Sequence, residues 1–460
     1  MSHDVLVIGA GPAGSAAAGR LAAAGARVAL VGAAGRAGWE GLSRRSIALL
    51  AEEGLRAGEG ALAGVGLGDA RGIIEGPFPR GGMWAVGRPV EGTEWLVERR
   101  ALAQALRVHA RAAGVDVRCD AVTGLEWRRG RWRPRLRSGD RVAAAVVIDA
   151  RGRRGPERRG PLLLAVGQQF RRRPGAARGA PLESGTQLHA MDFGWCWWAV
   201  RADMLWVQVV GRPRGGRLAG ACPSEARAAG HPAAWPAAAA AQIPALARVL
   251  EGALPDGGLV ARPAHARLAL PACGATRWRV GDAALAFDPL SGQGVYEALR
   301  GARLVATAVQ SVMGGGAAAP AQRFVAERQA ESWARGVHTA ASFYRENAAR
   351  GAFWSETATA YERLVPEAAA LAPHIERRPV LCGGLFEERD VIVTTQHPRG
   401  VWHVADVPLV SLKGYLEATE HATIAGAAAA VDRPAAAVES AIHWLQQTGI
   451  VAQRLCPSAP

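Results

Sequence analysis

The chain has 460 residues, enough for two or three domains with a large buried core. Its formal net charge is +15, and this excess is carried by arginine, since lysine occurs only at Lys413. No apolar run approaches the roughly 18 to 20 residues that a membrane helix needs. A strand pattern starts almost at Met1 and leaves no room for a signal peptide. These features predict a cytoplasmic protein without a membrane span.

The arginine excess has two interpretations. One is a compositional bias of the whole chain toward alanine, glycine and arginine. The other is an arginine-rich face that docks an acidic protein or substrate, for which residues 151–178 are the densest stretch.

The cysteines and histidines predict no metal site. The six cysteines lack the short paired spacings of zinc sites and disulfide frameworks, and the histidines form no cluster with metal-ligand spacing. We interpret the cysteines as small buried residues without a redox role. They are Cys119, Cys196, Cys222, Cys273, Cys382 and Cys456.

A dinucleotide-binding turn is predicted at the N-terminus. A buried-strand pattern at residues 4–8 runs into Gly9, Gly11 and Gly14, and then into a helix that continues to about residue 24. The first glycine allows the tight turn, the second leaves room for the pyrophosphate, and the third lets the helix pack closely on its strand. The phosphates then lie on the unpaired N–H groups of the helix N-terminus.

One position departs from this pattern. Residues 27–31 predict the second strand, and the carboxylate that usually ends it and binds the adenosine ribose falls near Gly32, which has no side chain. The group that holds the ribose is therefore left open.

Further strands and helices follow in chain order. Residues 99–106 predict a helix closed by Gly114, and residues 146–149 predict a buried parallel strand that ends in a glycine turn. Between 161 and 265 the pattern changes to alternating strands rich in tryptophan, which indicates an inserted second domain. Residues 277–312 then predict a strand, a second glycine segment and a helix.

The C-terminal part has a different character. Residues 320–371 are helical in composition, and residues 391–395 and 401–404 predict two strands. A helix at 421–431 and another from 432 to Gly449 would complete a winged-helix module. From 376 to 460 seven basic residues face nine acidic ones, a net charge of −2, which favours a protein or peptide contact over DNA.

The two glycine segments resemble those of the FAD-dependent monooxygenases of the p-hydroxybenzoate hydroxylase fold, which include tryptophan halogenases and geranylgeranyl reductases. The resemblance covers about residues 1–350 and implies an α/β fold with a Rossmann-like FAD-binding domain. It divides the chain into this domain, at 1–160 and 266–350, an inserted mixed-sheet substrate domain, at 161–265, a helical connector, at 351–375, and the winged-helix-like module, at 376–460.

The same resemblance assigns the cofactor contacts. Arg99 matches the arginine that helps hold the pyrophosphate, Asp282 would bind the ribityl chain, and residues 289–294 would lie against the isoalloxazine ring. The helix that follows would stabilise negative charge on reduced flavin. A weaker match puts residues 40–43 beside the flavin. The expected FAD-binding residues are Gly9, Gly11, Gly14, Glu40, Ser43, Arg99, Asp282, Pro289, Gly292, Gln293 and Gly294.

Within this superfamily, residues 288–294 are most similar to flavoproteins that mature tryptophylquinone cofactors, which act for lysine or glycine oxidases and for quinohemoprotein amine dehydrogenase. The similarity implies a monooxygenase that uses dioxygen to hydroxylate a tryptophan side chain in a protein substrate. A radical S-adenosylmethionine maturation enzyme is a further expected partner, whereas nucleic acid and membranes are not.

Other activities of the superfamily stay open. They are hydroxylation of a small aromatic compound, halogenation and reduction of a geranylgeranyl-type substrate, besides a flavin-bound scaffold without catalysis. A halogenase needs a lysine near its tunnel, and none precedes Lys413. Trp195 and Trp197 would form either an aromatic wall for an indole or part of a packed sheet core. No side chain is assigned as an obligatory catalytic group.

Overall fold

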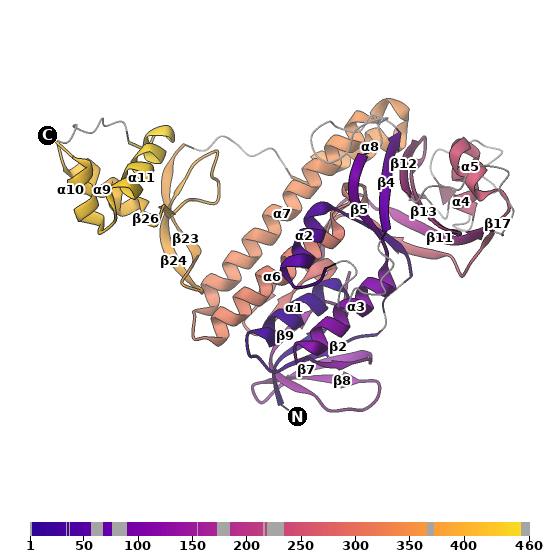
Figure 1. Ribbon diagram of the computed structural model, residues 1–460, viewed down its shortest axis with the longest axis horizontal. Helices are drawn as coiled ribbons and strands as arrows, with labels where there is room; N and C mark the ends of the chain where they lie inside the picture. Colours follow the sequence, from indigo (N-terminus) through magenta and orange to yellow (C-terminus); the bar gives the residue numbers. More distant parts are fainter. Residues whose placement is uncertain are drawn as a thin grey trace. The chain divides into compact units, whose positions relative to one another are not determined.

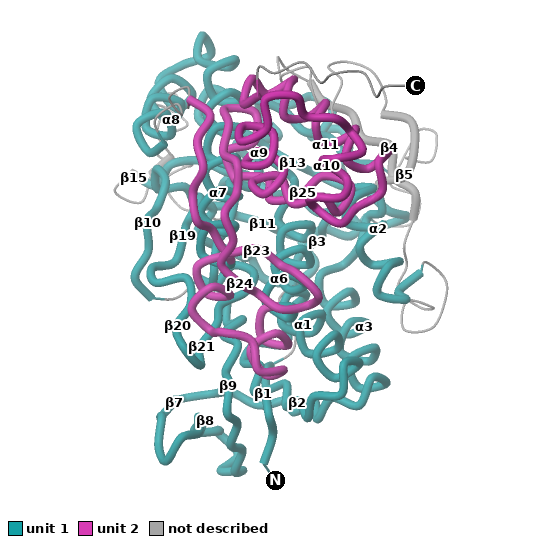
Figure 2. Tube along the Cα trace, turned by 90° about the vertical axis from the view of Figure 1, so that its left-hand side faces the viewer, with its two compact units in different colours: residues 1–307, 325–366 teal, residues 308–324, 367–460 magenta. Residues whose placement is uncertain are grey.

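The computed structural model describes residues 2–33, 35, 37–56, 68–75, 90–153, 155–172, 185–214, 217–218, 234–365 and 372–451. The chain forms two compact units (Figure 2). The first comprises residues 1–307 and 325–366, and the second comprises residues 308–324 and 367–460. No helix within the described ranges has the length and apolar character required to cross a membrane.

The first unit contains an eight-stranded sheet, of which β2, β7, β8 and β9 are labelled near the N-terminus in Figure 1. Its centre is parallel, in the order β21–β9–β1–β2–β6. These strands are β1 (Ser2–Ile8), β2 (Val28–Val31), β6 (Asp116–Arg118), β9 (Ala143–Asp149) and β21 (Arg277–Arg279). The antiparallel strands β7 (Val122–Arg128), β8 (Arg131–Leu136) and β20 (Cys273–Gly274) complete the sheet. Runs of valine, isoleucine and leucine form β1 and β2 because both of their faces are buried.

Different elements cover the two faces of this sheet. The β7–β8 hairpin and the residues after it bury Leu6 and Ile8 against Leu136 and Val142. Helices also pack in this part of the unit. Leu102 of α3 and Leu299 of α6 lie in a second apolar cluster. The helices of this region are α1 (Pro12–Ala23), α2 (Arg44–Glu52), α3 (Arg99–Ala112) and α6 (Gly294–Met313).

A nine-stranded, mostly antiparallel sheet forms the second layer of the first unit, with the order β17–β11–β14–β13–β12–β4–β5–β3 and β18 beside β11. Six of its strands are β11 (Leu164–Arg172), β12 (Gly185–Met191), β13 (Gly194–Arg201), β14 (Met204–Gly211), β17 (Ala253–Pro255) and β18 (Val260–Pro263). The other three come from the first hundred residues: β3 (Trp39–Leu42), β4 (Gly68–Glu75) and β5 (Val90–Glu98). The substrate sheet is therefore larger than the segment 161–265 to which the sequence assigned it.

Side chains of the strand β13 pack on both faces of this sheet. Cys196 and Trp198 lie in the core shared with α4 (Trp235–Gln242) and α5 (Pro244–Leu250). Trp195 and Trp197 alternate with them and lie on the other face, because successive side chains of a strand point to opposite sides.

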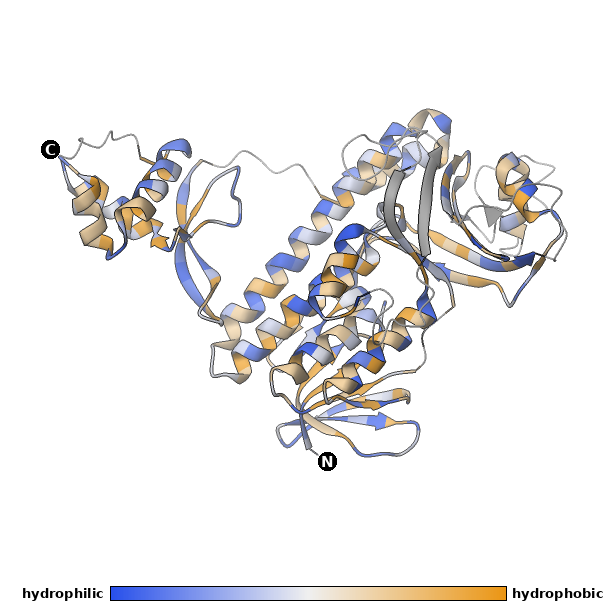
Figure 3. Ribbon diagram, viewed as in Figure 1, coloured by the Kyte–Doolittle hydropathy of each residue, from blue (hydrophilic) through white to orange (hydrophobic). Residues whose placement is uncertain are grey.

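Two further helices contribute to the first unit: α7 (Ala318–Glu346), whose residues from 325 onward belong to it, and the shorter α8 (Ala352–Glu362). Figure 3 shows hydrophilic and hydrophobic colours alternating along α7, and its buried residues Trp333, Val337, Ala340 and Tyr344 follow helical spacing. Residues of α8, which the sequence placed in a connector, share this core. The short elements are β10 (Glu157–Arg159), β15 (Pro213–Arg214), β16 (Arg217–Leu218), β19 (Arg267–Ala269) and β22 (Leu285–Ala286).

The second unit contains a long hairpin, β23 (His374–Cys382) and β24 (Leu385–Val393), a short one, β25 (His403–Val404) and β26 (Val407–Pro408), and three helices. The helices are α9 (Leu409–Ala418), α10 (Ile424–Val431) and α11 (Ala435–Gln447), and they share one apolar core. The winged-helix expectation is not confirmed, since both hairpins precede the helices and no strand follows α11 up to Val451, the last described residue.

Candidate functional site

The candidate site lies where three parallel strands end. The segments that follow β1, β9 and β21 are joined by backbone hydrogen bonds, from Ala150 N to Ile8 O (2.7 Å) and from Val280 N to Asp149 O (3.1 Å). The carboxyl edge of a parallel sheet is the usual place for a ligand in α/β folds. The first and second glycine segments both start at this edge.

The first glycine segment forms a cradle. Gly9 has φ +114°, and a Cβ there would lie 2.3 Å from the Ala150 carbonyl oxygen, while a Cβ at Gly14 would lie 1.9 Å from Gly9 O. A Cβ at Gly11 would meet nothing within 4 Å, although Gly11 lines the cavity. Gly11 also precedes Pro12 as the N-cap of α1, with no side-chain cap. Space and unpaired N–H groups therefore coincide at one point, as anion binding requires.

The second glycine segment lies against this cradle. Its first turn starts at Gly281, where a Cβ would come within 2.7 Å of the Ala13 Cβ. Its second turn, Pro289–Ser291, ends at Gly292 with φ +62°, a conformation that favours glycine. Two segments that are about 270 residues apart thus line one cavity.

The cavity has a volume of ≈670 Å³. Ten of the eleven residues that the sequence assigned to FAD line it, and Gln293 alone does not; the ten are Gly9, Gly11, Gly14, Glu40, Ser43, Arg99, Asp282, Pro289, Gly292 and Gly294. Ser43 also has a structural role, because its Oγ accepts a hydrogen bond from Ser46 N (3.3 Å) at the start of α2.

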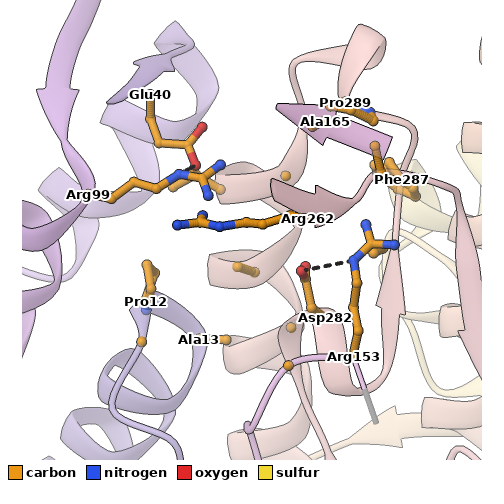
Figure 4. Close-up of a pocket in the computed structure, with 18 of the residues that line it drawn as sticks. Pro12, Ala13, Glu40, Arg99, Arg153, Ala165, Arg262, Asp282, Phe287 and Pro289 are labelled. Carbon is orange, nitrogen blue, oxygen red and sulfur yellow. Dashed lines mark ion pairs between the residues drawn. The ribbon is translucent and has the colours of Figure 1, made fainter. Parts of the chain in front are cut away.

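Arg99, Arg153 and Arg262 are among the arginines that line the end of the cavity with the glycine cradle (Figure 4). Arg99 forms an ion pair with Glu40, and Arg153 lies 3.5 Å from a carboxylate oxygen of Asp282. Arg262, from β18 of the second sheet, donates to the Ala37 carbonyl oxygen (2.6 Å). Figure 4 shows the guanidinium groups of Arg99 and Arg262 facing the same part of the cavity, near the start of α1. This arrangement suits a doubly charged anion such as a pyrophosphate.

A buried ion cluster fixes the loop that carries Arg153. Asp149, at the end of β9, accepts hydrogen bonds from Arg151 Nη2 (2.7 Å) and Arg277 Nη2 (2.8 Å). Burial alone would raise the pKa of this carboxyl, but the hydrogen bonds from both arginines outweigh it and lower the pKa to about 2. Asp149 therefore stays ionised and ties β9 to β21.

The other end of the cavity is lined mainly by the second sheet. Trp197 is partly exposed and pairs with Gln208 across the strands, whereas Trp195 is only 2% exposed. Trp195 donates from its indole nitrogen to the Tyr344 hydroxyl (3.2 Å). Both tryptophans line the cavity and contribute to the apolar core, so the two interpretations from the sequence are compatible. The further lining residues at this end are Ala165, Thr186, Leu188, Gln208, Phe287 and Phe343.

Sequence reasoning missed several of the lining residues. Asp288 lies within the quoted glycine segment, yet its fully buried carboxyl gave no signal of its own. Arg153 follows the predicted strand and turn, which offered a hint, whereas nothing in the sequence around Arg262 predicted its position. Part of the dense arginine stretch, residues 173–178, and Cys222 and Cys456 lie outside the described residues.

Cysteine and metal chemistry find no support in the described ranges. Cys119, Cys196, Cys273 and Cys382 are not joined in disulfides, and no group of three or more metal-ligating side chains occurs there.

Comparison with known proteins defines the class. No protein-family profile and no curated protein sequence matches the chain. Its fold is shared with solved structures of flavin-dependent enzymes, including the halogenase CmlS, at 18% identity and a TM-score of 0.65 over 99% of each chain. The myxobacterial chondrochloren halogenase CndH, a FAD-dependent enzyme, has 23% identity and a TM-score of 0.62, with 77% of this chain and 86% of that chain covered. The chain therefore has the fold of the FAD-dependent halogenases and hydroxylases.

A further structure matches over nearly the whole length, with a higher identity and TM-score than CmlS. The peptidyl tryptophan dihydroxylase QhpG, essential for tryptophylquinone cofactor biogenesis, has 26% identity and a TM-score of 0.75. The alignment covers 98% of this chain and 100% of QhpG, so it includes the C-terminal unit. CndH, in contrast, leaves about a quarter of this chain unmatched.

Proposed function

We propose that the chain binds FAD and acts as a flavin-dependent monooxygenase on a tryptophan side chain of a protein substrate, in the formation of a tryptophylquinone cofactor. The observation that carries the proposal is the continuous cavity, with a glycine cradle and arginines at one end and a tryptophan-lined sheet at the other. A charged dinucleotide and an apolar aromatic ring need those two environments side by side.

The residues present fit FAD at the nucleotide end. The open space at Gly11 and the uncapped N-terminus of α1 would accept the pyrophosphate, with Arg99 and Arg262 neutralising its charge. Asp282 would bind the ribityl hydroxyls, and the turn from Pro289 to Gly294 would border the ring system. Bound FAD would supply the electrons that activate dioxygen for insertion of an oxygen atom.

The protein groups at the other end would orient the acceptor and exclude water. Trp195 is held rigidly by Tyr344, which makes it a fixed wall, while partly exposed Trp197 and Gln208 would face the incoming side chain. An electron-rich indole packs favourably on such aromatic side chains. No acid or base side chain is assigned to the oxygen transfer itself.

The full-length similarity to QhpG supports a protein substrate, because QhpG is a peptidyl tryptophan dihydroxylase. Dioxygen is the co-substrate in this proposal, and a radical S-adenosylmethionine enzyme that modifies the same substrate protein is proposed as a functional partner. The proposed compartment is the cytoplasm, whose reducing conditions suit described cysteines that form no disulfide.

Oxygen consumption tests the proposal directly. The purified, FAD-loaded chain is reduced with dithionite under anaerobic conditions and mixed with oxygenated buffer, with and without a tryptophan-containing polypeptide. We expect fast reoxidation and a mass gain of one or two oxygen atoms on the tryptophan-containing polypeptide, and none on a matched polypeptide with phenylalanine in its place. A chain that binds no FAD, or a reduced flavin that ignores oxygen under both conditions, contradicts the proposal.

A further inference from the structure

A buried carboxyl lies next to the turn that borders the proposed flavin position. Asp288 is 0% exposed and precedes Pro289. Its Oδ1 accepts from Leu290 N (2.9 Å), and its Oδ2 accepts from the hydroxyls of Tyr361 (2.7 Å) and Tyr344 (3.0 Å). The two tyrosines come from α8 and α7, which are distant in the sequence, so three elements converge on one carboxyl group.

Among the described residues this carboxyl has no ion-pair partner. In the described part of the chain no arginine, lysine or histidine lies within ion-pair distance of Asp288, and the nearest charge that acts on it is Arg153, after β9. Burial is the main influence and raises its pKa to about 6, against hydrogen bonds from Tyr361, Leu290 and Tyr344 that lower it. Asp149, also buried but paired with two arginines, has a pKa near 2. Of these two buried carboxyls, Asp288 is the one whose pKa is raised toward neutral pH.

The surrounding groups cannot take that proton themselves. Burial raises the pKa of both Tyr344 and Tyr361 well above the ordinary tyrosine value, so they remain neutral donors. Arg212, which acts on Tyr344, forms an ion pair with Glu356. Asp288 is the group of this network that changes its charge.

We propose that Asp288 takes up a proton from solvent when the flavin in this cavity is reduced, and so compensates the negative charge that the ring gains. The inference rests on the proposed FAD site. The balance is FAD plus two electrons and one proton giving the reduced anion, and the Asp288 carboxylate plus one proton giving the neutral carboxyl. A reductant such as dithionite supplies both electrons. A new negative charge beside a buried carboxylate without a counter-ion favours its protonation.

A redox titration tests this coupling without any turnover. The midpoint potential of FAD bound to the full chain is measured from about pH 5 to pH 9, spanning the carboxyl transition and its shift, for the unchanged protein and for Asp288→Asn. The asparagine keeps an oxygen acceptor for Leu290 N but cannot ionise. We expect the two proteins to have equal midpoint potentials at the acid end of the range. Above the Asp288 pKa the difference between their potentials should grow by up to ~30 mV per pH unit, which is a tenfold change in the equilibrium constant of a two-electron couple. The asparagine variant has the higher potential because its site lacks the opposing charge.

A second pair of variants keeps the test decisive if Asp288→Asn folds poorly. Tyr361→Phe removes one donor to the carboxylate, so the pKa rises and the change of slope moves to higher pH than in the unchanged chain. Thr357→Val removes another fully buried hydroxyl of α8, one that donates to Phe353 O, and should leave the slope unchanged.

The possible results separate the inference from the proposed function. Curves for the unchanged chain, Asp288→Asn and Tyr361→Phe that run parallel over the whole pH range overturn the inference, and they leave FAD binding intact. Absence of bound FAD in the unchanged chain overturns the proposed function instead.

Discussion

Two alanine substitutions in the same glycine turn should differ in their effects. Gly11→Ala should keep its stability and lose cofactor affinity, whereas Gly14→Ala should lose stability. At Gly11 a Cβ meets nothing within 4 Å, and φ −82° with ψ −177° is open to any residue. Without FAD, Gly11→Ala should therefore be as stable as the unchanged chain, or more stable by about 0.4–1 kcal/mol, because alanine restricts the unfolded chain. At Gly14 the Cβ would lie 1.9 Å from Gly9 O, so Gly14→Ala should lose about 1–3 kcal/mol through a forced backbone shift.

Gly11→Ala should instead weaken the binding of FAD. The methyl group at Gly11 occupies the space for the pyrophosphate, and losing two charge-assisted contacts of about 1.5–3 kcal/mol each amounts to about 3–6 kcal/mol. The dissociation constant for FAD would then be about 100 to 10,000 times higher. Urea unfolding of the FAD-free proteins and titration by flavin fluorescence measure the two quantities separately. Unchanged FAD affinity in Gly11→Ala, or a clear loss of its stability without FAD, would refute the reasoning.

Three further predictions concern other parts of the first unit. The pKa of Asp149 is depressed to about 2, so its contribution of about 2 kcal/mol to the free energy of unfolding is fully present above the unfolded-state pKa of 3.8 and is lost as the pH falls through 2. Asp149→Asn should therefore destabilise the chain at neutral pH and much less in strong acid, as urea unfolding at the two pH values can measure. Glu157→Gln removes the carboxylate 2.8 Å from fully buried Arg267 and should cost about 3–5 kcal/mol in the same assay; a neutral result means that other contacts suffice. Burial raises the pKa of the Cys196 thiol far above its usual value, whereas Cys119 is exposed. A thiol reagent should therefore label Cys119 in the native protein and Cys196 only after unfolding, and mass mapping of the labelled peptides can establish this.

Local patterns in the sequence predicted the two glycine segments that line one end of the cavity. The strand, glycine turn and helix around Gly9, and the segment from Gly281 to Gly294, are short-range features whose residue types follow from backbone geometry. Ten of the eleven residues assigned to FAD line the cavity, and six of these ten are glycines or prolines of the two segments, each with a local reason to occupy its position.

Long-range pairing was beyond the sequence. The strands β3, β4 and β5 extend a sheet whose other strands start after residue 163, and no local period indicates such a partner. The same limit hid the Asp288 network, since Tyr344 and Tyr361 appear in the sequence only as ordinary buried residues of helices. The helix α9 was missed because its apolar residues continue directly from the short strand β26.

The missing ribose carboxylate has a steric explanation. A Cβ at Gly32 would lie 2.3 Å from Ala10 N and 2.8 Å from the Ala10 Cβ, so the end of β2 approaches the first glycine turn too closely for any side chain. A carboxylate at this position would have to push apart the turn that forms the pyrophosphate cradle. In the proposed FAD site, recognition would therefore rest mainly on the phosphates, where Arg99, at the start of α3, and Arg262, of β18, face the same part of the cavity.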